Sequence, residues 1–492
     1  MLPSYFVQLD QLPLTPNGKI DKKALPDPEG LGLSSGVEYV APRNETEEKL
    51  VQIWQEILGK ENISIKDNFF ELGGHSLKAT SLTSQIHKQF EVKLALKDLF
   101  QKPILEEQAQ LIQQAEKKTF NTIPITAEQT SYSLSSAQRR LWILSQFEEG
   151  NIAYNMPGVY VFEGDLDKPA LEQAFTTLIE RHEILRTVFK EDAQGQVRQW
   201  IQTVEDIGFK ITYQDVRKEK KQPEKIRKIV QAECIKPFNL ATGPLLRASL
   251  YQVANDKWIF TYTMHHIISD GWSMNVLIKE LLLFYNTYIK GEVNPLKPLR
   301  IQYKDYAAWQ QERLSGEQLQ SYKTYWLEQF TGELPVLEIP TDKPRPAVKT
   351  YNGGAIHKTI NAKLSRGLKA LSQEQGATLF MGLLATVKTL LYRYTNQEDI
   401  IIGSPIAGRE HADLEDQIGF YINTLALRTQ FKGEDSYKEL LEKVKQVTLG
   451  AYEHQVYPFD ELVDELQLNR DMSRSALFDV MIVLQNLSLI HI

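Results

Sequence analysis

Two adjacent histidines carry the clearest potential for catalysis in this chain. His265 and His266 follow an apolar run directly, and Asp270 stands four residues after His266. A neutral imidazole at the end of a strand can act as a general base toward an amine or a hydroxyl. Successive strand residues point to opposite faces, so only one of the two histidines can face a given cleft. Taken alone, these residues favour a plainer interpretation, in which the histidines are structural and Asp270 caps the next helix.

Ser76 is the second candidate. It follows the tight turn of Gly73 and Gly74 and stands in the first turn of an expected helix. A helix N-terminus carries unpaired N–H groups and about half a positive charge. Such a site favours an anion, including a phosphodiester on the serine oxygen. On these physical grounds alone, a helix-capping role for Ser76 is favoured over a modification site.

Length and composition limit the kinds of protein that could position these residues. The 492 residues suggest two to four domains, and 42% hydrophobic and 24% charged residues indicate globular ones. A formal net charge of −7 argues against a nucleic-acid partner. The single cysteine, Cys234, excludes an internal disulfide and a cysteine-rich zinc module. No apolar run approaches the roughly 18–20 residues of a membrane span, and the N-terminus lacks a signal-peptide pattern. We therefore expect a cytoplasmic protein that has no membrane partner. We also expect no bound metal.

Composition divides the chain into successive segments. Residues 1–28 are too few to fold alone, and residues 29–42 have a linker composition rich in Pro, Gly and Ser. Residues 43–118 predict a small all-α bundle that carries Ser76, and residues 119–131 form a second linker. The remainder alternates helix-like and strand-like runs, as mixed α/β domains do. We expect a buried helix over residues 378–394, a core strand over residues 478–485, and a crossing between two lobes from Leu334 to Val348.

The stretch around Ser76 is similar to a known motif. Residues 67 to 77, D-N-F-F-E-L-G-G-H-S-L, resemble the attachment motif of peptidyl carrier domains of non-ribosomal peptide synthetases. The resemblance implies that Ser76 carries covalent 4′-phosphopantetheine, added by a phosphopantetheinyl transferase, and that the thiol of this group holds an amino acid as a thioester. We expect the neighbouring His75 to be exposed and positional.

The stretch around His266 resembles a second family. H-H-x-x-x-D-G from His265 is similar to the active-site motif of condensation domains and of chloramphenicol-acetyltransferase-like acyltransferases. Six further stretches agree with the condensation family in order, and they begin at Ser135, Arg181, Tyr303, Ile418, His454 and Arg470. The resemblance implies a two-lobed α/β fold of the chloramphenicol-acetyltransferase type. We expect an N-lobe over residues 132–333, a C-lobe over residues 334–486 that is shortened at its end, and a divergent tail over residues 487–492.

The resemblance also implies roles for single residues. His266, the second histidine, faces the tunnel between the lobes and assists attack of the acceptor amine, and His265 is counted with it among the catalytic-site residues. Asp270 is structural and pairs with an arginine, for which Arg181 and Arg186 are both candidates. The backbone N–H of Gly271 helps to hold the reacting groups. Asn423 stabilises the developing oxyanion or positions the substrate.

Residues 12 to 26, L-P-L-T-P-N-G-K-I-D-K-K-A-L-P, resemble the last motif of adenylation domains in the same synthetases. The resemblance implies that residues 1–28 are the remnant of an adenylation domain, that Lys19 contacts the adenylate there, and that Met1 is an internal residue of a longer protein. We assign no adenylation activity to this segment, because the ATP-binding core lies upstream.

The combined expectation is a piece of a synthetase for secondary metabolites such as peptide antibiotics. Its carrier domain presents a donor, which the resemblance implies is L-configured, and its condensation domain forms a peptide bond with an aminoacyl group on a downstream carrier domain. Two alternatives stay open. One is a carrier and interaction fragment without catalysis, and the other is an ester-forming acyltransferase that uses the same His266.

Overall fold

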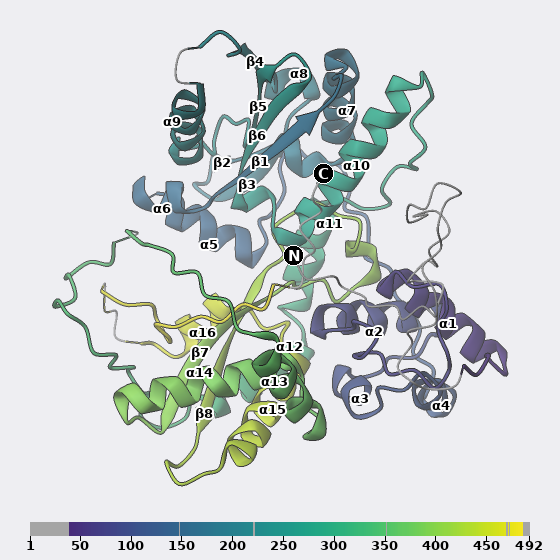
Figure 1. Ribbon diagram of the computed structural model, residues 1–492, viewed down its shortest axis with the longest axis vertical. Coiled ribbons are helices and arrows are strands. Elements are labelled where there is room, and N and C mark those ends of the chain that lie inside the picture. The colour runs from purple at the N-terminus through teal and green to yellow at the C-terminus, as the bar shows by residue number, and fades with distance from the viewer. Residues whose placement is uncertain are drawn as a thin grey trace, which may run out of the picture. The chain divides into compact units, whose positions relative to one another are not determined.

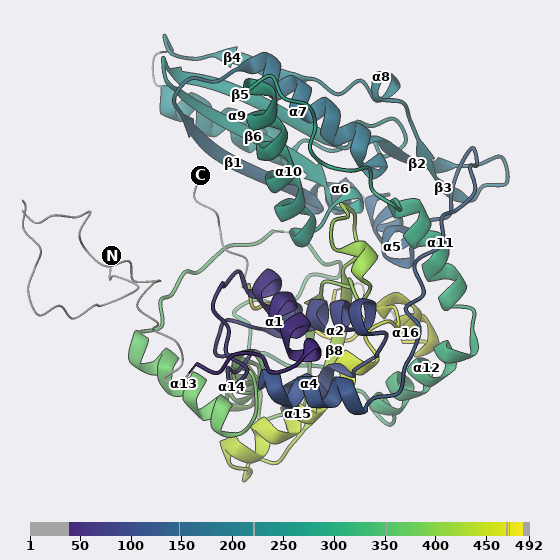
Figure 2. The same ribbon diagram turned by 90° about the vertical axis from the view of Figure 1, so that its right-hand side faces the viewer.

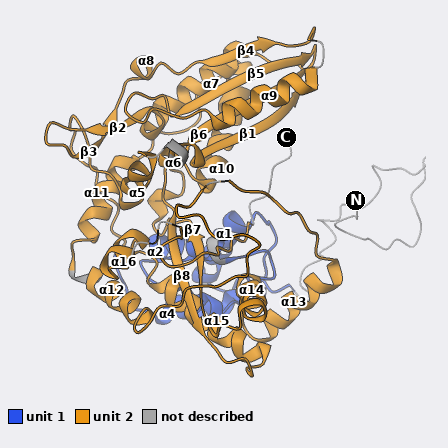
Figure 3. Cartoon of the chain, turned by 90° about the vertical axis from the view of Figure 1, so that its left-hand side faces the viewer, with its two compact units in different colours: residues 1–119 blue, residues 120–492 orange. Residues whose placement is uncertain are grey.

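The computed structural model describes residues 39–146, 148–219, 222–350, 352–468, 471 and 473–485. It divides into two compact units, residues 1–119 and residues 120–492, which Figure 3 shows in different colours. Three parts of the sequence discussed above lie outside the described residues. They are the adenylation-like segment with Lys19, residue Arg470 at the start of the last condensation-like stretch, and the tail 487–492. Over the described part of the chain, no helix has the length and apolar character needed to span a membrane.

The first unit is the expected helical bundle, with α1 (Glu45–Leu58), α2 (Ser76–Phe90), α3 (Leu96–Gln101) and α4 (Leu105–Gln114). Helix α1 begins where the Asn44 side chain accepts the N–H of Glu47 at 3.0 Å. It ends at Gly59, whose φ of +70° is the left-handed conformation that glycine adopts without strain. The indole of Trp54 packs edge-on against Phe69 in the buried centre of this bundle. The expected helical carrier region is thus confirmed.

The second unit contains two lobes, each built on its own sheet (Figures 1 and 2). The first lobe holds a four-stranded sheet in the order β1 (Asn155–Glu163), β6 (Lys257–His265), β5 (Leu246–Ala254), β4 (Ile211–Asp215). Strands β1, β6 and β5 are antiparallel, and β4 pairs in parallel with β5. Helices α7 (Lys168–Arg181) and α10 (Gly271–Ile289) lie on one side of this sheet and α9 (Gln222–Ile235) on the other (Figure 1).

Shorter elements complete the first lobe and lead to the second. They are α5 (Ser136–Ser145), α6 (Glu148–Ala153), the hairpin β2 (Thr187–Glu191) and β3 (Val197–Ile201), α8 (Val204–Ile207), α11 (Tyr303–Arg313) and α12 (Glu317–Gln329). The expected crossing from Leu334 to Val348 contains neither helix nor strand. Helix α12 is held to the second lobe because the indole N–H of Trp326 donates to the carbonyl of His454 at 2.9 Å.

The second lobe is built on β7 (Asp399–Ile406), which pairs antiparallel with β8 (Asn423–Gln430). Around this pair lie α13 (Ala362–Glu374), α14 (Leu379–Thr395), α15 (Tyr437–Glu453) and α16 (Phe459–Glu465). The helix expected over residues 378–394 is present as α14, but the expectation that it is buried holds for one side only. Leu390 and Tyr394 are 54% and 66% exposed, because only one side of α14 packs into the lobe.

The expected core strand over residues 478–485 is wrong. This segment meets β7 at a single parallel bridge, where Gly403 donates to the carbonyl of Val480 at 3.0 Å and accepts the N–H of Ile482 at 2.9 Å. Two backbone hydrogen bonds tie a segment to a sheet edge without burying it. Met481 and Val483 are accordingly about half exposed, at 49% and 53%.

Candidate active site and carrier site

The two histidines at the end of β6 have opposite surroundings. His265 is the last residue of β6 and is fully buried, beside the ring of Phe238. Its Nδ1 accepts the N–H of Ile267 at 3.1 Å. Burial lowers the pKa of His265 to about 3, with a smaller contribution from His266. His265 is therefore a neutral core residue that supports the turn after the strand.

His266 begins the short turn that follows β6 and is only partly covered. Its Nδ1 lies 2.7 Å from the carbonyl oxygen of Ser269. A carbonyl can only accept, so Nδ1 carries the proton and the lone pair lies on Nε2. The ring meets Phe420 edge-on at 4.9 Å and Tyr154 at 6.4 Å. Burial lowers the pKa of His266, which keeps the ring neutral near pH 7 and able to take a proton at Nε2.

Asp270 is the N-cap of α10 and a buried junction between the two lobes. Its Oδ1 accepts the backbone N–H of Ser273 at 2.8 Å and the Ser273 hydroxyl at 2.6 Å, and its Oδ2 accepts the N–H of Tyr421 at 3.1 Å. Arg409 Nη2 donates to Oδ1 at 3.2 Å, and both side chains of this pair are 1% exposed. Arg409 also lies over the ring of Tyr421 at 4.1 Å. The helix cap and the arginine pairing expected for Asp270 are both present.

The two candidate arginine partners of Asp270 were wrong. Arg181 pairs with Glu280 at 3.0 Å, and Arg186 lies 3.8 Å from Glu183. The true partner, Arg409, comes from the loop after β7, 139 residues further along the chain. Arg409 lies outside the seven stretches singled out in the sequence above, and the fold brings the two charges together.

Gly271 and Asn423 flank this junction. Gly271 is the first residue of α10, a position whose N–H has no partner within its own helix. The amide nitrogen of Asn423 donates to the carbonyls of Gln455 at 2.8 Å and Tyr457 at 2.7 Å, and its oxygen accepts the N–H of Phe459 at 3.0 Å. Both amide hydrogens thus hold the 455–459 loop, so Asn423 acts in this arrangement by positioning that loop.

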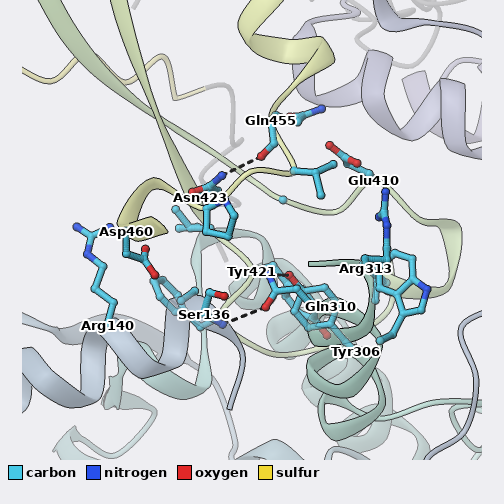
Figure 4. A pocket seen from close by; sticks show the side chains of 18 residues that line it. Ser136, Arg140, Tyr306, Gln310, Arg313, Glu410, Tyr421, Asn423, Gln455 and Asp460 are labelled. Carbon is cyan, nitrogen blue, oxygen red and sulfur yellow. Dashed lines mark hydrogen bonds between the residues drawn. The ribbon is translucent and has the colours of Figure 1, made fainter. Parts of the chain in front are cut away.

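A pocket of about 60 Å³ lies between the lobes, next to this loop (Figure 4). Phe420 belongs both to the pocket wall and to the surroundings of His266. Arg140 and Asp460 lie at one end, and Arg313 and Glu410 lie at the other (Figure 4). Sequence reasoning missed this pocket, because its walls come from α5, α11 and the segments 408–423 and 455–460.

Two residues of the pocket wall carry buried hydroxyl groups. Ser136 Oγ and Tyr421 Oη have no hydrogen-bond partner within the described part of the chain, and both residues are 2% exposed. Buried polar groups are normally paired, so an unpaired hydroxyl in a pocket wall suits a polar ligand. A peptide-like amide would match, since it offers both a donor and an acceptor.

The carrier site lies in the first unit. Ser76 is the first residue of α2, and the side chain of the preceding His75 makes no capping hydrogen bond to the helix. The N–H groups at the start of a helix favour an anion such as a phosphodiester. Gly73 has a φ of +101°, and a Cβ on Gly74 would lie 2.3 Å from the ring of Phe69. Both glycines are therefore needed for the turn that presents Ser76, and the site fits a phosphopantetheine group.

The expectation that His75 is exposed was wrong, since it is half-buried. Burial, reinforced by the charge of Lys78, lowers the pKa of His75 to about 4. His75 therefore adds no positive charge beside Ser76 at neutral pH.

Family comparisons match both units. Residues 48–112 match the phosphopantetheine attachment site, and residues 128–490 match the condensation domain. The chain is 47% identical over 486 residues to bacitracin synthase 3 of Bacillus licheniformis and 46% identical over 487 residues to tyrocidine synthase 3 of Brevibacillus parabrevis. Each alignment covers 99% of this chain and 7% of the relative, so the chain spans a small part of the length of these relatives.

Solved structures agree on the fold. The X-domain from teicoplanin biosynthesis matches with a TM-score of 0.67 and 25% identity, over 73% of this chain and 79% of that chain. The first condensation domain of the calcium-dependent antibiotic synthetase matches with a TM-score of 0.58 and 19% identity, over 72% of this chain and 80% of that chain. The second match concerns the fold alone.

Proposed function

The chain belongs to the condensation-domain family of non-ribosomal peptide synthetases, and we propose that it forms a peptide bond between a donor on its own carrier domain and an aminoacyl acceptor. The observation that carries this proposal is the geometry of His266. A hydrogen bond to Ser269 places the Nδ1 proton, and the lone pair on Nε2 is left to receive the proton of an attacking amine. The enzyme is thus an acyltransferase.

Ser76 is the residue we propose for covalent attachment of 4′-phosphopantetheine, with the first turn of α2 holding its phosphodiester. When bound, this cofactor supplies a thiol that carries the donor acyl group. A phosphopantetheinyl transferase would add it. Gly73 and Gly74 keep the turn before Ser76 tight.

For the chemical step, the protein has two main tasks. It holds the donor and the acceptor in position, and it supplies one proton acceptor. The acceptor amine would attack the donor carbonyl carbon, with the cofactor's thiol as the leaving group. Nε2 of His266 would take the amine proton and would return it to that leaving group. Asp270 does not touch the reactants; together with Arg409 it fixes the start of α10 and hence the turn that holds His266. Holding both reactants in one cleft supplies much of the rate.

The pocket beside Phe420 is where we propose that a peptide-like part of a substrate binds. The hydroxyls of Ser136 and Tyr421 can pair with an amide there. Asn423 would keep the 455–459 wall in place, and the N–H of Gly271 would face the reacting groups. The L-configuration of the donor belongs to the same proposal.

The surroundings of the reaction follow from this assignment. We propose a downstream aminoacyl carrier domain as the acceptor, an upstream adenylation core as the source of the donor, and a cytoplasmic location. We also propose the boundaries 1–28 for the adenylation remnant, 29–42 and 119–131 for linkers, 43–118 for the carrier, and 132–333 and 334–486 for the two lobes, with 487–492 as a tail. Membership of the synthetase family and the fused carrier disfavour both the non-catalytic and the ester-forming alternatives.

Intact-protein mass spectrometry tests the assignment with matched variants. Ser76→Ala should abolish the mass gain from a phosphopantetheinyl transferase. His266→Ala should load normally but transfer its donor to an acceptor carrier far more slowly. His265→Asn, which keeps a side-chain acceptor for the N–H of Ile267, is the control for the position of the base. Equal transfer rates for the two histidine variants would refute the choice of His266.

A further inference from the structure

The segment between the two domains is fastened to the condensation domain at its start. His411 Nε2 lies 3.0 Å from the carbonyl of Asn121, and the His411 ring packs on Phe120 at 4.6 Å. The backbone N–H of Asp413 lies 3.2 Å from Nδ1 of His411. Because that N–H can only donate, Nδ1 accepts and Nε2 carries the proton that the Asn121 carbonyl receives. A single neutral tautomer satisfies both contacts.

Three further contacts continue this attachment. Asp413 Oδ2 accepts the N–H of Ile123 at 3.0 Å, and Arg300 donates to the Ile123 carbonyl at 2.9 Å while it pairs with Asp413. The Ile123 side chain is fully buried in the core of the first lobe. Asp305 accepts the N–H of Thr126 at 2.8 Å. We call His411, Asp413, Arg300 and Asp305 the linker clasp.

On the carrier side, the chain is also held until just before the clasp. The N–H of Lys118 donates to the carbonyl of Glu91 at 2.6 Å, and the Lys118 carbonyl lies 3.0 Å from Nε2 of His87. Only Thr119 and Phe120 stand between Lys118 and Asn121. Three Cα-to-Cα steps span at most about 11 Å.

Release of the clasp would change this tether greatly. The next backbone anchor is Tyr132, which pairs with Gln199. From Lys118 to Tyr132 there are 14 steps, about 50 Å when fully extended, with a coil-like average near 20 Å. With the clasp formed, only Thr119 and Phe120 link the two anchored parts of the chain. With the clasp released, the flexible link extends from Lys118 to Tyr132.

We infer that His411 and Asp413 are positioning residues that set the length of the carrier tether. The inference deepens the proposed function, because the tether determines where a donor on Ser76 can be presented. The same loop carries Arg409, two residues before His411, which pairs with Asp270. The clasp thus joins the linker to the loop that supports the active-site turn.

Two measurements that need no catalysis test the inference on the full chain. The variant His411→Ala/Asp413→Ala removes the donor to Asn121 and the acceptor from Ile123. Hydrogen exchange at the N–H of Ile123, which loses its acceptor, should then become at least about tenfold faster, whereas the N–H of Thr126 keeps its bond to Asp305. His411→Gln/Asp413→Asn keeps a donor and an acceptor at these positions and should retain most of the protection. Asp435→Asn, at an aspartate of the second lobe that pairs with Lys443, is the control away from the linker.

Pulsed electron paramagnetic resonance reports the tether itself. Spin labels on the single cysteine, Cys234, and on an exposed α1 position, Glu56→Cys, give one distance across the linker. Because Thr126 stays bonded to Asp305, the freed stretch grows from three to eight steps, and the width of the distance distribution should rise by about half in the alanine variant. It should stay unchanged in Asp435→Asn. Unchanged exchange at Ile123, or a width no larger than the control's, would overturn the inference. Neither measurement depends on transfer of the donor acyl group. A result that refutes the inference about the clasp therefore leaves the proposed function untouched, and the reverse also holds.

Discussion

Replacing Arg409 with methionine would leave the carboxylate of Asp270 buried without its cation. Both side chains are 1% exposed, and Arg409 also donates to Ser273 Oγ at 2.8 Å and to the carbonyl of Gln417 at 2.7 Å. Removing one partner of a buried pair costs about 3–5 kcal/mol. This is a large share of the 5–15 kcal/mol by which a typical domain is stable.

Differential scanning calorimetry, which can separate the two units, would measure the loss in the condensation unit. The control is Arg217→Met, since the Arg217–Asp215 pair is solvent-exposed and its loss should barely change the melting temperature. The double variant Arg409→Met/Asp270→Asn removes the unpaired charge, so its loss should be smaller than the sum of the single losses by about 1–3 kcal/mol. The reasoning is refuted if Arg409→Met is no less stable than Arg217→Met, or if the single effects simply add.

Three further predictions concern proton binding and the pocket wall. Burial lowers the pKa of His266 below its usual 6.5, so the transfer rate should fall with acid only below pH 6.5; a limb at or above that value would contradict the assignment. Burial lowers the pKa of Lys388 to about 7 from its usual 10.5, so the unfolded chain binds more protons between these values. Stability should thus rise by about 2 kcal/mol from pH 7 to pH 9, as urea titrations can show, and Lys388→Met should lack this rise. Asn423→Ala should lower the free energy of unfolding by about 1–3 kcal/mol and slow transfer without affecting loading of Ser76. An unchanged transfer rate would show that the position of the 455–459 loop does not matter for the reaction.

The local parts of the site could be predicted from the sequence because short-range rules govern them. The alternation of strand residues predicted that only one of the two histidines could face a cleft, and the resemblance selected His266. The structure places His265 in the core and His266 beside Phe420. The glycine turn predicted that a helix begins at Ser76, and α2 begins there. The cap formed by Asp270 follows from the same kind of local pattern.

The long-range parts could not be predicted in this way. Arg409 reaches Asp270 across 139 residues, and no periodicity or spacing marks that pairing. The apolar run from Phe478 favours a strand, but a strand needs a partner along its length, and this segment meets β7 only at Gly403. The linker composition before Tyr132 suggests a free tether, yet His411 and Asp413 hold that segment from a distant part of the chain.

The most direct measurement of the central claim is single-turnover transfer followed by intact-protein mass spectrometry. The chain would be loaded at Ser76 with an L-aminoacyl phosphopantetheine and mixed with a separate carrier that holds an aminoacyl acceptor. The account predicts that the donor mass leaves this chain and appears as a dipeptide on the acceptor, and that His266→Ala slows this transfer strongly. A donor that stays on Ser76 in the wild-type chain, with loading complete, would contradict it.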